Sequence, residues 1–181
     1  KVLLTSTSEV YGSANYIPID EKHELQAQSP YSASKIASDH IGEAFFKSFN
    51  VPVTIVRPFN AYGPRQSMRA VIPTIMSQIL SKSKTINIGN ISTARDYNYV
   101  TDIALAFYEI LMARNTNGEI INVASGKKIL IKDLIKKIIN LSSQNKIKIK
   151  ISKKRVRPKN SEVNLLLGCN KKIRKITKWK P

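Results

Sequence analysis

Tyr31 and Lys35 are a pair of residues whose types and spacing could do chemistry. They lie four positions apart, so on a helix they share one face. A tyrosine phenol has a pKa of about 10 and is a poor base at neutral pH, but a lysine cation one turn away favours the phenolate. Tyr31 could then accept the proton of a substrate hydroxyl while hydride leaves the same carbon. Because the chain is rich in lysine, one such pair also arises by chance, and the surrounding residues must decide its meaning.

A second group of polar side chains, Thr7, Ser8 and Glu9, comes shortly after a strand-like run at residues 1–4, of which Val2, Leu3 and Leu4 are apolar. The apolar run predicts a buried strand, and its C-terminal end is expected to open into a cleft, where open α/β sheets bind their ligands. A threonine hydroxyl at this end could hold the substrate oxygen. These three side chains and the Tyr–Lys pair are the predicted reaction centre.

The elements that must position this centre follow from the spacing of apolar residues. The pattern predicts helices over residues 30–48, 71–80, 101–114 and 131–142, and strands over 51–56, 85–88, 119–123 and 147–151. Residues 57–65 are expected to form a loop, and Thr101 with Asp102 to cap the third helix. A strand, a helix and a second strand form a parallel unit, so the predicted fold class is α/β.

Composition bounds the classes of protein that are possible. The 181 residues are 42% hydrophobic and 23% charged, which suits a globular domain, and no apolar run is long enough to span a membrane. One cysteine and two histidines exclude an internal disulfide and make a metal site improbable, so we expect no metal and a reducing, cytoplasmic location.

Positive charge is concentrated at the end of the chain. Residues 127–181 hold 19 Lys or Arg against 2 Asp or Glu, which is +17 of the total charge of +18. The lysines interrupt amphipathic patterns and no aromatic residues are interleaved, so we favour a solvated helix face over a nucleic-acid surface. A basic binding module without catalysis is the alternative from another class.

Four stretches carry a resemblance to a known family: residues 7–12, 29–35, 57–64 and 95–102. In this order they resemble the extended short-chain dehydrogenase/reductase family, specifically its nucleotide-sugar epimerases and dehydratases. The resemblance implies a partial Rossmann-type parallel sheet that binds NAD, with a smaller α/β domain for the nucleotide sugar. It also implies a homodimer when the protein is full length, and a role in polysaccharide biosynthesis.

The resemblance implies a division of the chain into two domains. Residues 1–57 and 96–124 are assigned to the NAD domain, and residues 58–95 and 125–181 to the nucleotide-sugar domain. The family's Gly-rich turn for the cofactor pyrophosphate is absent from this sequence. We therefore expect a fragment that lacks the N-terminal third of a family member and does not hold NAD tightly alone, and the function is assigned to the parent protein.

The resemblance also assigns roles to individual residues. The reaction centre would consist of Thr7, Ser8, Glu9, Tyr31 and Lys35. NAD would be contacted by Tyr31, Lys35 and Pro58. The nucleotide sugar would be contacted by Asn60, Arg95 and Arg157. For Arg95 the alternative is a salt bridge to Asp96 or Asp102 that holds a turn.

Small signatures separate the members of the family. Glu9 favours 4,6-dehydratases over epimerases, and Ser8 favours the GDP-mannose type over the dTDP-glucose type, which has aspartate there. UDP-glucuronate decarboxylases also carry Thr-Ser-Glu and are the nearest rival. Residues 69–75 and 157–163 are most similar to the dehydratases of legionaminic acid biosynthesis, which act on a nucleotide-linked N-acetylglucosamine.

Overall fold

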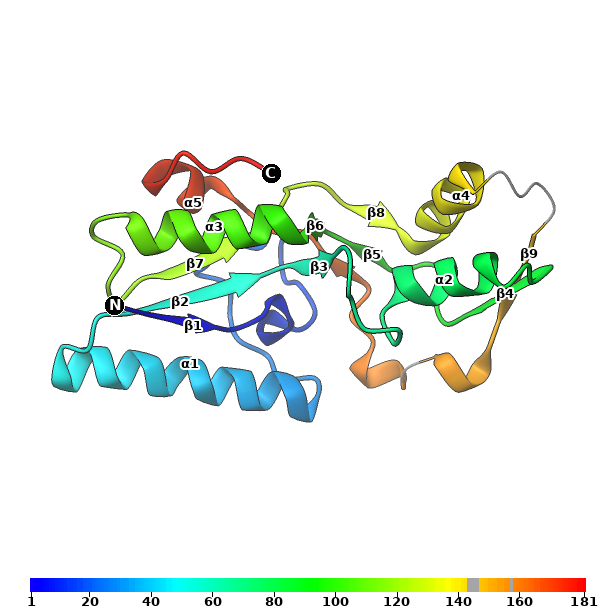
Figure 1. Cartoon of the computed structure of the whole chain (residues 1–181). Coiled ribbons are helices and arrows are strands. Elements are labelled where there is room, and N and C mark those ends of the chain that lie inside the picture. The colour runs from blue at the N-terminus through cyan, green and yellow to red at the C-terminus, as the bar shows by residue number, and fades with distance from the viewer. Residues whose placement is uncertain (143–146, 157) are drawn as a thin grey trace.

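A three-stranded parallel sheet lies at the centre of one half of the molecule. The computed structural model describes residues 1–142, 147–156 and 158–181. The strands are β1 (Val2–Thr5), β2 (Val53–Pro58) and β7 (Ile120–Val123), in the order β1-β2-β7 and all parallel (Figure 1). β2 is buried along almost its whole length, as its run of β-branched residues predicts. The predicted α/β class with a parallel sheet is confirmed.

Helices cover both faces of this sheet because successive strand residues point to opposite sides. α1 (Pro30–Phe49) brings Gly42 against Leu4, Val53 and Ile55 on one face. Val56 instead joins the core on the other face, beneath α3 (Val100–Met112) and α5 (Lys171–Ile176). Figure 1 shows α1 on one side of the strands and α3 with α5 on the other. The sheet, whose strand ends carry the predicted reaction centre, is thus held by helices on both faces.

The start of α1 is fixed by a reciprocal capping box. The hydroxyl of Ser29 accepts from the backbone N–H of Ser32 at 3.1 Å, and the hydroxyl of Ser32 accepts from the backbone N–H of Ser29 at 3.0 Å. Pro30 occupies the first turn, where its missing N–H costs nothing. This cap sets the position of Tyr31 in the first turn of the helix.

The second half of the molecule is built on a small isoleucine-rich core. α2 (Val71–Leu80) and α4 (Ile131–Leu141) pack with the parallel pair β4 (Thr85–Ile88) and β9 (Lys148–Ile151). The core side chains are Ile75, Ile79, Ile86, Ile88, Ile131, Leu134 and Ile135. The predicted helices and strands of this region agree with the observed ones to within a residue or two.

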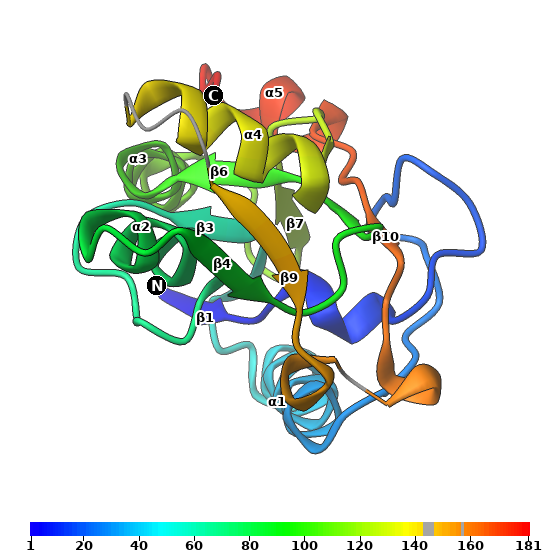
Figure 2. The ribbon, with the colours of Figure 1, turned by 90° about the vertical axis from the view of Figure 1, so that its right-hand side faces the viewer.

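Short strands and turns join the two halves (Figure 1), and Figure 2 views the molecule from the end that carries α2, α4, β4 and β9. β3 (Asn60–Tyr62) pairs with β6 (Tyr97–Tyr99), and a three-stranded sheet has the order β10-β5-β8. Its strands are β5 (Ala94–Arg95), β8 (Ile129–Leu130) and β10 (Leu165–Leu166). The 3-10 turns are η1 (Ser8–Tyr11), η2 (Lys153–Arg155) and η3 (Lys159–Ser161).

Three expectations about local structure were wrong. β1 is an edge strand rather than a buried one, and Val2 is 47% exposed because within the described residues only β2 pairs with it. The expected loop at residues 57–65 contains β3. α3 begins at Val100 after Tyr99, so neither Thr101 nor Asp102 is its cap.

The last residues of the chain return to the parallel sheet. Ile173 of α5 and Trp179 are buried in the same cluster as Val56 and Ile121. The indole N–H of Trp179 donates to the backbone carbonyl of Asp102 at 2.7 Å. The end of the segment assigned to the nucleotide-sugar domain therefore packs on the sheet assigned to the NAD domain, and the division into domains stays a prediction.

The buried carboxylate of Asp96 ties three distant segments together. It accepts the backbone N–H groups of Ser125 (2.9 Å), Gly126 (3.0 Å) and Gly168 (3.3 Å), and also the hydroxyl of Ser125 and the amide of Asn98. Burial raises the pKa of Asp96, and the donated hydrogen bonds oppose that rise. Asp96 thereby joins the start of β6, the turn after β7 and the segment before α5.

Asp96→Asn is expected to lower the free energy of unfolding by about 2–3 kcal/mol, because an amide NH2 cannot accept the hydrogen bonds that one carboxylate oxygen accepts. Urea denaturation followed by circular dichroism measures this change. Asp133→Asn is the matched control, since the Asp133–Lys136 pair at 4.0 Å is solvent-exposed and is worth about 0.5 kcal/mol at most. Equal effects of the two substitutions would contradict the role of Asp96.

Candidate active site

The turn that carries Glu9 is held by Thr7. The hydroxyl oxygen of Thr7 accepts the backbone N–H of Glu9 at 3.2 Å, which makes Thr7 the N-cap of η1. Ser8 is buried, whereas Glu9 is only partly buried. Because Thr7 uses its oxygen as an acceptor in this cap, its O–H remains able to donate to a ligand. The three residues predicted from the sequence are therefore presented by one tight turn at the end of β1.

Lys35 reaches the same end of β1. Its ammonium donates to the backbone carbonyl of Thr5 at 2.9 Å, two residues before Thr7. Tyr31 lies one turn earlier on α1, and its side chain is 51% exposed. α1 and η1 contact each other directly. The structure thus brings the Tyr31–Lys35 helix and the Glu9 turn to one edge of the sheet, where parallel sheets bind ligands.

A buried charged cluster, formed by Arg57, Asp39 and Tyr11, lies between α1 and η1. Arg57 is 2% exposed, and its Nε donates to a carboxylate oxygen of Asp39 at 2.9 Å. Its Nη1 donates to the hydroxyl of Tyr11 at 3.1 Å, and the guanidinium carbon lies 5.0 Å from the centre of the Tyr11 ring. The Tyr11 hydroxyl in turn donates to Asn122 at 2.7 Å. Sequence analysis gave Arg57 and Asp39 no role, because no local pattern reveals that they meet.

The loop between η1 and α1 is held against β7 by polar contacts. A carboxylate oxygen of Glu21 accepts the backbone N–H of Asn122 at 2.9 Å, and burial raises the pKa of Glu21. His23 is 4% exposed, with Nε2 accepting from the N–H of Asn15 and Nδ1 lying 2.9 Å from the carbonyl of Glu24. The ring of His23 packs edge-on against Tyr11 inside this loop.

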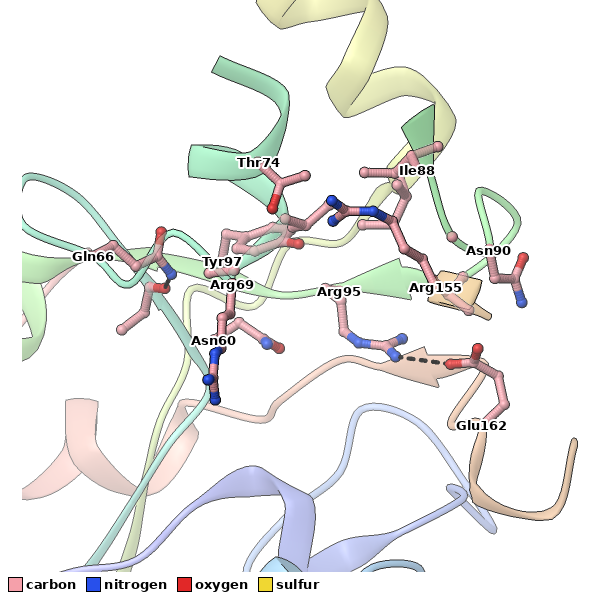
Figure 3. Close-up of a pocket in the computed structure, with 16 residues that line it drawn as sticks. Asn60, Gln66, Arg69, Thr74, Ile88, Asn90, Arg95, Tyr97, Arg155 and Glu162 are labelled. Atoms are coloured by element: carbon pink, nitrogen blue, oxygen red, sulfur yellow. Dashed lines mark hydrogen bonds and ion pairs between the residues drawn. The ribbon is translucent and has the colours of Figure 1, made fainter. Parts of the chain in front are cut away.

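A pocket of about 520 Å³ opens next to β3 and β5 (Figure 3). It brings together two residues predicted from the sequence, Asn60 and Arg95, with Arg69 and Arg155, which the sequence did not single out. Arg95 forms an ion pair with Glu162 at 3.7 Å, and not the salt bridge to Asp96 or Asp102 that was the alternative for it. Arg157, the third residue predicted here, lies outside the described residues. Three guanidinium groups around one cavity favour an anionic ligand.

The same pocket also presents hydrogen-bond acceptors. The side-chain oxygens of Asn60 and Gln66 are shielded from solvent and accept no hydrogen bond from the described part of the chain. The orientation of the Gln66 amide is set by its NH2 group, which donates to the carbonyl of Ala61 at 2.7 Å. Unsatisfied buried acceptors are costly, so a ligand with hydroxyl or N–H donors is favoured here.

The pocket and the reaction centre are separate places on the chain. Thr7, Ser8, Glu9, Tyr31 and Lys35 do not line the pocket. They are connected to it through β2 and β3, since Pro58 ends β2 and Asn60 begins β3. A ligand that uses both places must be elongated.

The edge of the sheet has features that fit a dinucleotide cofactor. The ammonium of Lys35 reaches the C-terminal end of β1, and Pro58 ends the adjacent strand β2. The buried hydroxyl oxygen of Ser6 has no hydrogen-bond partner among the described residues. Ser6 was not selected from the sequence, because one serine among several near Thr7 carries no distinguishing signal. In the described ranges no cluster of three metal-ligating side chains occurs, and no helix is long and apolar enough to cross a membrane.

A parallel sheet with a Tyr-x-x-x-Lys helix at its C-terminal edge is the arrangement expected of an extended short-chain dehydrogenase/reductase. The sequence matches the GDP-mannose 4,6-dehydratase family over residues 1–181, and the chain belongs to this family. The resemblance to nucleotide-sugar dehydratases and epimerases is thereby confirmed.

Individual relatives include both kinds of enzyme. A dTDP-D-glucose 4,6-dehydratase of Dictyostelium discoideum is 35% identical over 148 residues, covering 76% of this chain and 34% of the relative. A putative UDP-glucose 4-epimerase of Methanocaldococcus jannaschii is 35% identical over 140 residues, covering 74% and 44%. The crystal structure of a dTDP-glucose 4,6-dehydratase from Bacillus anthracis in complex with NAD is similar with a TM-score of 0.90 and 28% identity, covering 100% and 56%. The chain thus spans about a third to about half of these relatives.

The alkaline titration of tyrosine tests the environment of Tyr11. Burial raises the pKa of Tyr11 to about 12, and Arg57 partly opposes the rise; burial also raises the pKa of Tyr97 to about 12. The neutral phenol of Tyr11 stabilises the fold fully below the pKa of about 10 of an unfolded tyrosine, and this contribution is lost as pH rises to 12. Ultraviolet absorbance should show phenols that ionise near pH 12, and Tyr11→Phe should remove one of them.

Tyr108→Phe is the matched control, because Tyr108 is 59% exposed on α3. It should leave the component near pH 12 unchanged. If Tyr11→Phe also left that component unchanged, the buried hydrogen-bonded state of Tyr11 would be wrong.

Proposed function

We propose that the chain carries the reaction centre and substrate pocket of an NAD-dependent nucleotide-sugar 4,6-dehydratase. The observation that supports this most is the position of Lys35 and Tyr31 next to the Glu9 turn at the C-terminal edge of a parallel sheet. Family membership and the NAD complex of the Bacillus anthracis relative support the cofactor. The proposal applies to the whole protein, which we infer to be a homodimer in the cytoplasm that serves polysaccharide biosynthesis.

In this proposal the nucleotide sugar spans both places. Arg95 and Arg155 bind the diphosphate, because guanidinium groups pair well with phosphate oxygens. The free acceptors of Asn60 and Gln66 bind donors on the ligand. The sugar then extends toward Tyr31 and Glu9. Arg157 stays a predicted substrate contact.

The chemistry begins with Tyr31. As a general base, Tyr31 takes the proton from the hydroxyl at sugar carbon 4, with Lys35 one turn away on the same helix. NAD, held by Tyr31, Lys35 and Pro58, supplies the acceptor for the hydride that leaves carbon 4 and the donor of the hydride that later reaches carbon 6. Thr7 donates to the sugar oxygen.

Elimination of water is the task of Glu9. The ketone at carbon 4 acidifies the proton at carbon 5. Glu9 takes that proton and passes it, directly or through a water molecule, to the hydroxyl at carbon 6, which leaves as water. Ser8 is buried beside Glu9 and stays a predicted member of the reaction centre. Oxidation at carbon 4 and reduction at carbon 6 balance, so no external reductant is consumed.

An epimerase is the second candidate, because the Methanocaldococcus relative is described as a putative 4-epimerase at the same identity. Both reactions share the oxidation at carbon 4, and they differ in whether a carboxylate removes the proton at carbon 5. Mass spectrometry separates the two outcomes, since a dehydratase product has lost water and an epimerase product keeps the mass of its substrate. Loss of carbon dioxide from UDP-glucuronate would instead identify a decarboxylase.

Glu9→Gln tests the elimination step. The protein is supplied with NAD and, in separate reactions, dTDP-glucose, GDP-mannose and UDP-N-acetylglucosamine, and products are detected by mass. Glu9→Gln should reduce formation of the 4-keto-6-deoxy product by about 100-fold or more while substrate affinity stays within about twofold. Glu24→Gln, in the exposed loop, is the control. Product formation by Glu9→Gln at the rate of the unchanged protein would rule out this role.

Arg95→Met tests the diphosphate site independently of turnover. Removal of the guanidinium should weaken binding of dTDP, measured by calorimetry, by about tenfold or more. Lys136→Met is the control, because Lys136 is an exposed cation on α4 and its loss changes the net charge equally. The same loss of affinity in both variants would show that only overall charge matters.

A further inference from the structure

Arg57 joins the two halves of the reaction centre at one buried point. It lies at the end of β2, Asp39 lies on α1, and Tyr11 lies in η1. Arg57 and Asp39 are 2% and 1% exposed, and Tyr11 is fully buried. One guanidinium therefore contacts, through two different nitrogens, the helix of Tyr31 and Lys35 and the turn of Glu9.

The two residues that Arg57 contacts, Asp39 and Tyr11, lie close in sequence to Lys35 and Glu9. Asp39 follows Lys35 by four residues, so the two lie one turn apart on neighbouring positions of the same rigid helix. Tyr11 follows Glu9 by two residues within the same turn of η1. A shift of Asp39 or Tyr11 relative to Arg57 would be carried directly to Lys35 or Glu9.

A purely stabilising role does not account for this pair well. Taking two charges out of water is costly, and apolar replacements for buried ion pairs are often neutral or stabilising. The second carboxylate oxygen of Asp39 is buried and has no hydrogen-bond partner among the described residues. The carboxylate is thus committed to Arg57, and what the pair provides is one defined geometry.

We propose that Arg57 is a positioning residue that sets the separation between Glu9 and the Tyr31–Lys35 pair by binding Asp39 and Tyr11 simultaneously. This inference rests on the proposed function. Proton removal at sugar carbon 5 and at the hydroxyl of carbon 4 must occur on one bound sugar, and an error of about 1 Å in such a constellation is expensive. Lysine cannot replace Arg57, because its single nitrogen cannot make the divergent contacts of Nε and Nη1.

Pulsed dipolar spectroscopy measures this separation without turnover. Spin labels are placed at Ser13, directly after the Glu9 turn, and at Ala37, which is exposed on α1 between Lys35 and Asp39, with Cys169 replaced by Ser. The comparison is among the unchanged protein, Arg57→Met, Arg57→Lys and Tyr11→Phe. Thr54→Val is the matched control, since Thr54 is a buried polar residue of the same strand whose hydroxyl donates to Thr116 on the side of α3.

Arg57→Met and Arg57→Lys should both broaden the distance distribution and shift its centre, and Thr54→Val should leave it unchanged despite lower stability. Tyr11→Phe keeps the ion pair between Arg57 and Asp39, so a smaller broadening is expected. This variant tests the inference if Arg57→Met does not fold.

In the turnover assay, Arg57→Lys should lower kcat by about tenfold or more at a KM within about twofold. Unchanged distance distributions in the folded variants would overturn the inference, as would an equal change in Thr54→Val. Absence of turnover in the unchanged protein would contradict the proposed function while leaving the distances to decide the positioning role.

Discussion

Parallel pairing of β1 with β2 is the constraint on which the rest of the site depends. Parallel strands end at the same edge of a sheet, so Thr5 and Val56 lie side by side and the segments that follow them leave together. One segment becomes the Glu9 turn, and the other passes through Arg57 into the pocket at Asn60. The hydrogen bond from the N–H of Ser6 to the carbonyl of Val56 at 2.8 Å extends this pairing past the end of β1. The Glu9 turn and the segment that leads to the pocket thus begin side by side because of strand register.

Elements with strong local signals could be predicted from the sequence. α1 has a Ser–Pro start and apolar residues at helical spacing, and β2 has consecutive β-branched residues, so the structure places both within about two residues of the expected bounds. β5, β8 and β10 are two residues each and exist only because distant segments meet, so no local pattern could reveal them. The exposure of β1 has the same kind of cause, because a strand's burial depends on what pairs with it.

In the candidate site, too, some residues could be selected from the sequence, whereas others became visible only through contacts between distant segments. The resemblance to a family selected Tyr31, Lys35 and Glu9, and the structure places their elements in contact. Arg57 lies inside one of the quoted stretches, yet its pairing with Asp39 spans 18 residues and needs the fold to become visible. At the pocket the sequence selected Arg95, which the structure places there together with Arg155. Arg157, also selected, lies outside the described residues. The roles of these residues stay predictions.

Basic side chains border the pocket as well as the exposed face of α4. Lys132, Lys136 and Lys137 are exposed on α4, as expected for a solvated helix face. The pocket itself is bordered by Arg69, Arg95 and Arg155, with Glu162 as an acidic neighbour. A basic surface around such a cavity raises the local concentration of anions, which suits a nucleotide diphosphate ligand.

The most direct test of the central claim, that one elongated nucleotide sugar joins the pocket to the reaction centre, is a crystal structure of the protein with NAD and a bound nucleotide sugar. Our account predicts the diphosphate between Arg95 and Arg155, and the sugar with its carbon 4 hydroxyl within about 3.5 Å of the Tyr31 hydroxyl and its carbon 5 facing Glu9. A diphosphate bound elsewhere, or a sugar that points away from Tyr31 and Glu9, would contradict it.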